Sequence, residues 1–131
     1  MPWMLVHPPS APESPDPLTA LADRCVQCGL CLPHCPTYRL DRSEAESPRG
    51  RIAMARALSA GTLAPGGGVD THLDHCLGCR RCEAACPAGV EFGVLLVATR
   101  ALQRQGRRPA FPQRAAEALM ARPALLQHLL W

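Results

Sequence analysis

The stretch of sequence that decides the fold is Cys25-Val-Gln-Cys28-Gly-Leu-Cys31-Leu-Pro-His-Cys35-Pro36, which recurs as Cys76-Leu-Gly-Cys79-Arg-Arg-Cys82-Glu-Ala-Ala-Cys86-Pro87. Each cysteine of the second run lies 51 residues after its counterpart, and the two runs contain all eight cysteines of the chain. Three thiolates at two-residue spacing line a tight loop that wraps one cubane cluster, and the proline turns the chain away after the fourth. This spacing predicts two [4Fe–4S] clusters, which are electron carriers.

The fourth cysteine of each run is expected to bind the cluster of the other run, as it does in two-cluster proteins with this spacing. Cluster one is therefore assigned to Cys25, Cys28, Cys31 and Cys86. Cluster two is assigned to Cys76, Cys79, Cys82 and Cys35. This crossing would tie the two halves of the domain together.

Two other uses of the cysteines stay open on the sequence alone. Structural zinc is bound by paired Cys-x2-Cys units, and the corresponding function would be a zinc-stapled interaction module. Each unit here is instead a triplet followed by a fourth, proline-flanked cysteine, a pattern that zinc does not require. A disulfide framework suits small secreted chains, and nothing in the sequence points to secretion.

Length and composition predict one small domain with flanking segments, because the chain has 131 residues. Its fourteen prolines and ten glycines indicate many turns and short elements around a small core. Bound metal clusters stabilise cores of this size, so we expect loss of the clusters to unfold the domain.

The formal charge is +3, and all fourteen basic residues are arginines. Each cluster with its four thiolates carries a charge of about −2, so two clusters would bring the net charge of the protein to about −1. Because the loaded protein is then not basic, nucleic acid is not an expected partner. The N-terminus lacks the basic start and apolar run of a signal peptide, and no stretch is long enough to span a bilayer. We therefore predict a cytoplasmic protein.

The sequence favours an all-α fold, because no strand pattern is present. Residues 1–16 are predicted to be a disordered, proline-rich lead. Residues 17–108 are expected to form the domain with the two cluster loops, and residues 109–131 a helical tail with a break at Pro123.

Start signals precede two of the expected helices. Asp16 followed by Pro17 begins one, and Ser47 followed by Pro48 begins another that runs through residues 51–58. Further helices are expected at 69–75 and 92–105. The apolar side of the last is predicted to comprise Val94, Val97, Ala101 and Leu102.

The residues around the cysteines resemble the iron–sulfur subunit of glycolate oxidase, within a wider group of lactate-utilisation and heterodisulfide-reductase-type subunits. The resemblance covers about residues 17–108. The motifs that carry it, beside the cysteine runs, are Cys35-Pro-Thr-Tyr38, Ser47-Pro-Arg-Gly-Arg51 and Cys86-Pro-Ala-Gly-Val90.

The resemblance implies an α-helical ferredoxin domain that belongs to an oxidoreductase complex. Its electrons would come from a flavin-binding 2-hydroxy-acid dehydrogenase subunit, acting on glycolate or lactate, and pass towards a quinone or another acceptor. This places it in the cytoplasm or at the inner face of the membrane. The chain lacks the Cys-Cys-Gly motifs of the longer family members, so a nonfunctional truncated remnant is an alternative.

The chain is not expected to contain a catalytic site of its own. No nucleophile–base pair, phosphate loop or dinucleotide fingerprint is present, so substrate chemistry would take place on a partner subunit. Gly29 and Gly78 are predicted to let backbone N–H groups approach cluster sulfurs. Arg49 and Arg51 are expected to bind carbonyl groups of the cluster loops.

Overall fold

The computed structural model describes residues 16–106, 110–124 and 127. Every regular element within these ranges is a helix, and none is a strand, so the all-α prediction is confirmed. The predicted lead, apart from Asp16, lies outside the described residues, as does most of the chain after residue 124.

The helices are short and follow one another closely along the described chain. In order they are α1 (Pro17–Asp23), η1 (Leu32–His34), α2 (Pro36–Asp41), η2 (Glu44–Glu46), α3 (Pro48–Ser59), α4 (Gly67–Asp74), α5 (Arg81–Ala84), α6 (Phe92–Gly106) and α7 (Phe111–Met120), where η marks a 3-10 helix. The first cysteine loop connects α1 to η1, and the second connects α4 to α5.

The two predicted start signals are used, in different ways. Ser47 accepts a hydrogen bond from the backbone N–H of Gly50 at 2.9 Å, and Pro48 occupies the first position of α3. Asp16 precedes α1 but does not cap it with its side chain. Its carboxylate instead accepts a hydrogen bond from the Ser59 hydroxyl, which joins the start of α1 to the end of α3.

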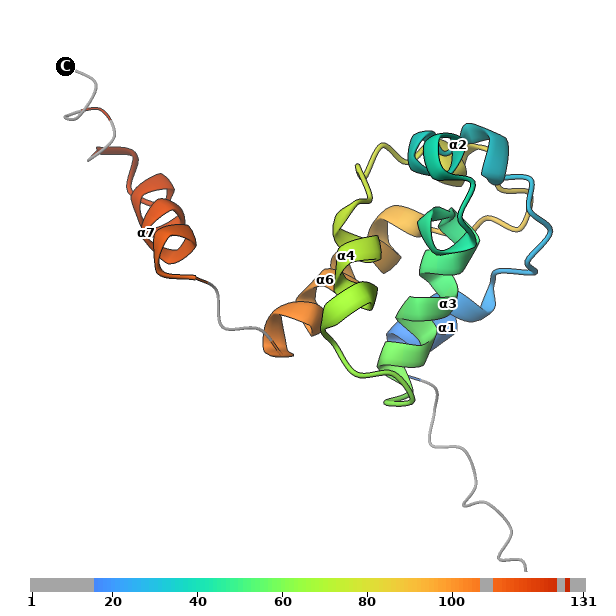
Figure 1. Cartoon of the computed structure of the whole chain (residues 1–131), viewed down its shortest axis with the longest axis horizontal. Coiled ribbons are helices and arrows are strands. Elements are labelled where there is room, and N and C mark those ends of the chain that lie inside the picture. The colour runs from blue at the N-terminus through green and yellow to red at the C-terminus, as the bar shows by residue number, and fades with distance from the viewer. Residues whose placement is uncertain (1–15, 107–109, 125–126, 128–131) are drawn as a thin grey trace, which may run out of the picture.

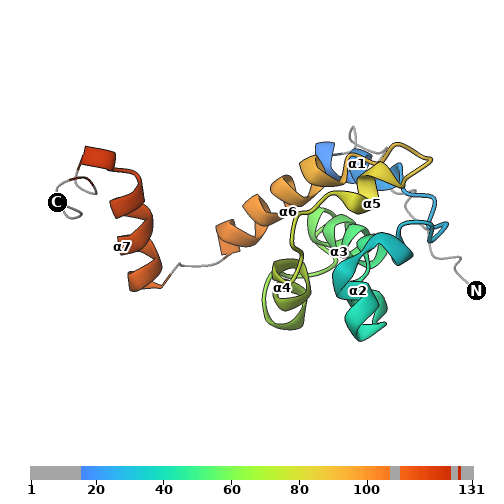
Figure 2. The same ribbon diagram turned by 90° about the horizontal axis from the view of Figure 1, so that it is seen from above.

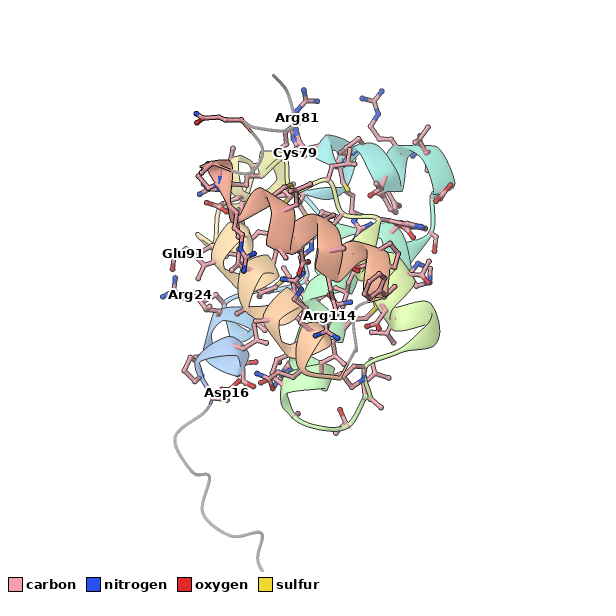
Figure 3. The ribbon with its side chains drawn as sticks, turned by 90° about the vertical axis from the view of Figure 1, so that its left-hand side faces the viewer. Asp16, Arg24, Cys79, Arg81, Glu91 and Arg114 are labelled. Atoms are coloured by element: carbon pink, nitrogen blue, oxygen red, sulfur yellow. The ribbon has the colours of Figure 1, made fainter. Side chains whose placement is uncertain are left out.

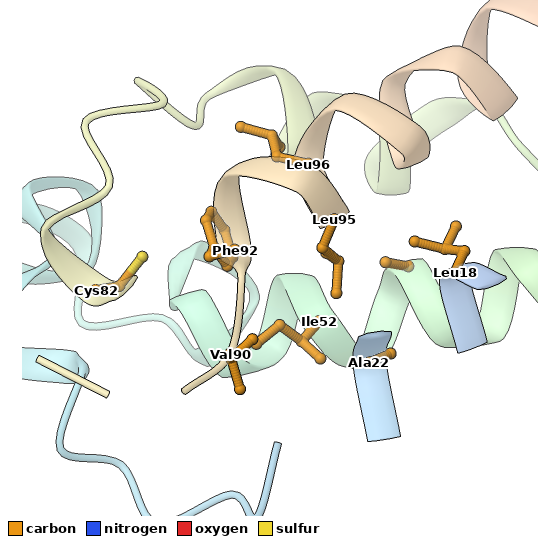
Figure 4. Packing of buried hydrophobic residues seen from close by; sticks show 9 residues of the cluster. Leu18, Ala22, Ile52, Cys82, Val90, Phe92, Leu95 and Leu96 are labelled. Carbon is orange, nitrogen blue, oxygen red and sulfur yellow. The ribbon is translucent and has the colours of Figure 1, made fainter. Parts of the chain in front are cut away.

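The core lies where α1, α3 and α6 pack together, and Figure 4 shows its side chains meeting between these helices. It comprises Leu18, Ala22, Ile52, Ala55, Cys82, Val90, Phe92, Leu95 and Leu96. Cys82 belongs to this cluster, and four further cysteines pack against it. The core and the cysteine sites are therefore continuous.

The predicted apolar side of α6 is wrong for Val94, Val97 and Ala101, whereas Leu102 is partly buried and packs against the core. Val94 and Val97 are 53% and 70% exposed, whereas Leu95 is 1% exposed. The buried side also contains two polar residues, Thr99 and Gln103. Thr99 donates a hydrogen bond to the carbonyl of Leu95 at 2.7 Å, which lets its hydroxyl lie in the interior.

The helices α1 to α6 form one body, and α7 lies beyond the end of α6 (Figures 1 and 2). The loops after α1 and α4 both lead to the end of this body where α2 lies. An ion pair between Arg104 and Glu117 connects α6 to α7. The cysteines are thus gathered at one end, away from α7.

We expect Leu95→Ala to lower the free energy of unfolding by about 2–5 kcal/mol, because it leaves a cavity in the core. Val97→Ala, on the exposed side of the same helix, should change it by less than about 0.5 kcal/mol. Urea unfolding of the anaerobic protein, followed by circular dichroism, measures both. If both variants lost the same free energy of unfolding, Val97 would be as important to the core as Leu95, as the sequence predicts.

Candidate metal centre

Cysteines of the first run line a hollow of about 430 Å³, a volume that includes space open to solvent. Cys25, Cys28 and Cys31 come from the loop after α1, and Cys86 reaches the same hollow from the segment after α5. Apolar core side chains, among them Ile52, complete the lining.

A second hollow, of about 320 Å³ with the space open to solvent included, is lined by the other cysteines. Cys76 and Cys79 come from the loop after α4, Cys82 from α5, and Cys35 from the residue before α2. Cys82 also lines the first hollow, so its buried side chain lies in the wall between the two. The structure thus brings all eight sequence-predicted ligands to two adjacent sites.

The chemistry of these side chains suits metal clusters. All eight cysteines are free thiols. The pKa of Cys82 is raised to about 12, mainly because the thiol is buried. The charges of the neighbouring Cys76, Cys31 and Cys35 add to this effect. Crowded thiols of this kind give up their protons when a metal cation binds them. Four sulfur ligands around a hollow are the donor set of a [4Fe–4S] cluster.

The backbones of the two loops repeat the same pattern. Gln27 and Gly29 have φ angles of +58° and +82°, and Gly78 and Arg80, each 51 residues later, have +64° and +57°. Both loops therefore take the left-handed conformation two and four residues after their first cysteine. Gly29 and Gly78 are not counterparts, because each occupies a different one of the two positions. Gln27 and Arg80 fill the remaining positions despite the cost for residues with a Cβ atom.

One arginine anchors each loop through a backbone carbonyl. Arg49 donates a hydrogen bond to the carbonyl of Gln27 at 3.1 Å, as predicted for a cluster loop. Arg100, from α6, donates to the carbonyl of Cys76 at 2.8 Å. The role of Arg100 was not predicted, because its distance along the chain gives no sign of this contact.

Arg51 lies at the centre of a buried network that reaches the second hollow. Its side chain is 1% exposed and pairs with the carboxylate of Glu46 at 2.5 Å. It also donates to the carbonyl of His72 at 2.8 Å, in α4 rather than in a cluster loop. One amino group lies 3.9 Å from Cys35 Sγ. The network therefore connects η2, α3 and α4 to one cysteine.

The Glu46 carboxylate is held in its charged form although only 3% of it is exposed. Burial opposes ionisation, but hydrogen bonds from His72 and His75 and the charge of Arg51 outweigh it and lower the pKa of Glu46. The two imidazoles lie 2.6 and 2.9 Å from one carboxylate oxygen. A buried charge with this many partners fixes the place of the segments that carry them.

Exposure differs among the cysteines. Cys28 and Cys79 are exposed, whereas Cys35 and Cys82 are buried. Figure 3 shows Cys79 and Arg81 together at one edge of the molecule. Each hollow thus has one cysteine at the molecular surface, where a partner can approach.

Comparison with known proteins points to the same chemistry. The family model described as a 4Fe-4S dicluster domain matches residues 21–90. A probable glycolate oxidase iron–sulfur subunit of Bacillus subtilis is 44% identical over 91 residues, which make up 69% of this chain and 20% of that protein. The glycolate oxidase iron–sulfur subunit of Escherichia coli is 38% identical over 112 residues, or 80% of this chain and 26% of that protein.

A trichloroethene reductive dehalogenase of Dehalococcoides mccartyi is 34% identical over 86 residues, covering 64% of this chain and 14% of that protein. The chain spans at most about a quarter of the length of these curated relatives. No solved structure matches the chain. Among the helices that the structure describes, none is both long and apolar enough to cross a membrane.

We expect Arg51→Gln to lower the free energy of unfolding by about 3–5 kcal/mol, because it removes the cation beside a buried carboxylate. Arg56→Gln is the matched control, since Arg56 lies on the same helix and forms an exposed pair with Asp23. That change should cost at most about 1 kcal/mol. Urea unfolding under anaerobic conditions compares them, and a similar small cost for both would show that the network is not critical.

Proposed function

Because this chain belongs to the family of 4Fe-4S dicluster domains, we propose that it is an electron-transfer subunit that holds two [4Fe–4S] clusters. The observation that carries the proposal is the pair of adjacent hollows, each lined by cysteines from both runs. Each cluster, when bound, supplies a carrier for single electrons. The domain itself supplies ligands, a fixed geometry and partial exclusion of water.

We propose the crossed set of ligands that the spacing predicts. Cluster one would be held by Cys25, Cys28, Cys31 and Cys86. Cluster two would be held by Cys76, Cys79, Cys82 and Cys35. The lining of the hollows supports this assignment, because Cys86 lies with the first run and Cys35 with the second. Cys82 lines both hollows. Because it is the third cysteine of the second run, we assign it to cluster two.

The partner of the proposed carrier is a flavin-binding dehydrogenase subunit that oxidises a 2-hydroxy acid. Support comes from the two relatives that are named as iron–sulfur subunits of glycolate oxidase. Electrons would leave towards a quinone or another acceptor, in the cytoplasm or at the inner face of the membrane. Val26, Leu30 and Leu77 are exposed apolar side chains within the cysteine loops, which suits docking of a partner near either site.

Protein purified without oxygen should contain about eight iron and eight acid-labile sulfide per chain. Its broad visible absorbance should bleach when dithionite is added, because the reduced clusters absorb less. Metal analysis, sulfide determination and the absorbance spectrum test this directly. Two zinc ions per chain without sulfide would replace the proposal with a zinc-stapled module.

Cys86→Ser should damage the cluster held by the loop after α1, although Cys86 belongs to the second run. The reciprocal variant, Cys35→Ser, should damage the cluster held by the loop after α4. Iron content and the electron paramagnetic resonance (EPR) spectra of the reduced variants separate the two cases. If Cys86→Ser instead removes the cluster bound by Cys76 and Cys79, each run binds its own cluster.

A further inference from the structure

The Thr37 hydroxyl lies beside the sulfur of Cys35, two residues along the chain. Its Oγ1 is 3.3 Å from Cys35 Sγ and 3.0 Å from the carbonyl oxygen of Glu46. The same Oγ1 is 3.0 Å from Nη1 of Arg51. Thr37 is partly buried. One hydroxyl therefore faces a sulfur, a carbonyl and a guanidinium group.

The donors and acceptors at this point can be counted. The guanidinium of Arg51 only donates, and its Nη1 carries two protons. Its two shortest contacts are with the Glu46 carbonyl at 2.6 Å and with Thr37 Oγ1 at 3.0 Å. These short contacts occupy both protons, so the 3.9 Å contact with Cys35 Sγ is the weakest of the three.

The remaining proton is that of the Thr37 hydroxyl. In the structure, where Cys35 is a free thiol, this hydroxyl is placed to donate to the Glu46 carbonyl at 3.0 Å, an oxygen that also accepts from Arg51 and can accept both bonds. A cysteine that binds iron has lost its S–H proton and carries negative charge. Hydrogen bonds to an ionised acceptor are roughly twice as strong as those to a neutral one. The thiolate of Cys35 is therefore the preferred acceptor.

The 51-residue repeat places a different residue at the corresponding position of the other run. Thr37 follows Cys35-Pro36, whereas Ala88 follows Cys86-Pro87. Ala88 lines the first hollow and has no hydroxyl. The two fourth cysteines thus differ in whether a side chain two residues later can donate to their sulfur.

We propose that Thr37 donates a hydrogen bond to the Cys35 thiolate and so makes cluster two easier to reduce, with Arg51 as the positioning residue that directs the hydroxyl. This inference rests on the proposed function, since it requires two bound clusters. Hydrogen bonds to ligand sulfurs are among the features that set cluster potentials. They raise the potential because they stabilise the more negative, reduced state.

The test is a redox titration of the anaerobic holoprotein, followed by EPR. Thr37→Val has nearly the same shape but no donor, and should shift the midpoint potential of cluster two to a more negative value. Thr37→Ser keeps a hydroxyl and should restore the wild-type value. Cys79→Ser, which removes a cluster-two ligand, identifies the remaining signal as that of cluster one.

Thr19→Val is the matched control, because the Thr19 hydroxyl bonds Ser59 and contacts no sulfur. It should shift neither potential, and Thr37→Val should leave cluster one unchanged. If the Thr37→Val protein does not bind cluster two, Thr37→Ala is measured instead in the same comparison. Alanine is the residue found at the corresponding position of the other run.

A second readout detects the proton itself. Pulsed EPR in D2O should show, besides the deuterons of Arg51 and of backbone amides, one further deuteron coupling at cluster two in wild type and Thr37→Ser that is lost in Thr37→Val. Unchanged potentials and an unchanged deuteron signal would overturn the role of Thr37. A wild-type protein without two iron–sulfur clusters would instead overturn the proposed function, before any Thr37 variant is compared.

Discussion

The buried ion pair between Arg51 and Glu46 is the interaction that ties together the segments around the second cysteine site. It joins α3 to η2, and further hydrogen bonds of its two side chains reach α4 and Thr37, two residues after Cys35. A buried pair of this kind adds little net stability compared with apolar residues of the same size. Its effect is to fix position, because each charged group is satisfied only when several separate segments are in place.

Much of the fold follows from local signals in the sequence. The 51-residue repeat locates both loops, and Ser47 with Pro48 marks the start of α3 because their backbone preferences act within a few residues. The exposed and buried sides of α6 could not be read in this way. Residues 94–97 are all apolar, so their periodicity does not select a face, and the buried polar residues Thr99 and Gln103 obscure the pattern further. The choice is made by α1 and α3, which pack against it.

The same distinction applies to the site. The cysteine spacing predicts which side chains should gather, because the loop geometry is encoded between neighbouring ligands. The supporting residues come from elsewhere in the chain: Arg100 reaches the second loop from α6, and Glu46 meets His72 across 26 residues. Contacts between residues so far apart in the chain cannot be recognised from the spacing of residues in a single sequence. The left-handed conformation of Gln27 and Arg80 is also hidden, because neither residue type favours it.

The lining of the first hollow bears on how the protein is made. A chain leaving the ribosome presents Cys25, Cys28 and Cys31 well before Cys86, and the apolar wall around Phe92 appears later still. The second hollow likewise needs Cys35 from the first part of the chain and Cys82 from the later part. Neither site is therefore complete before both cysteine runs have been synthesised.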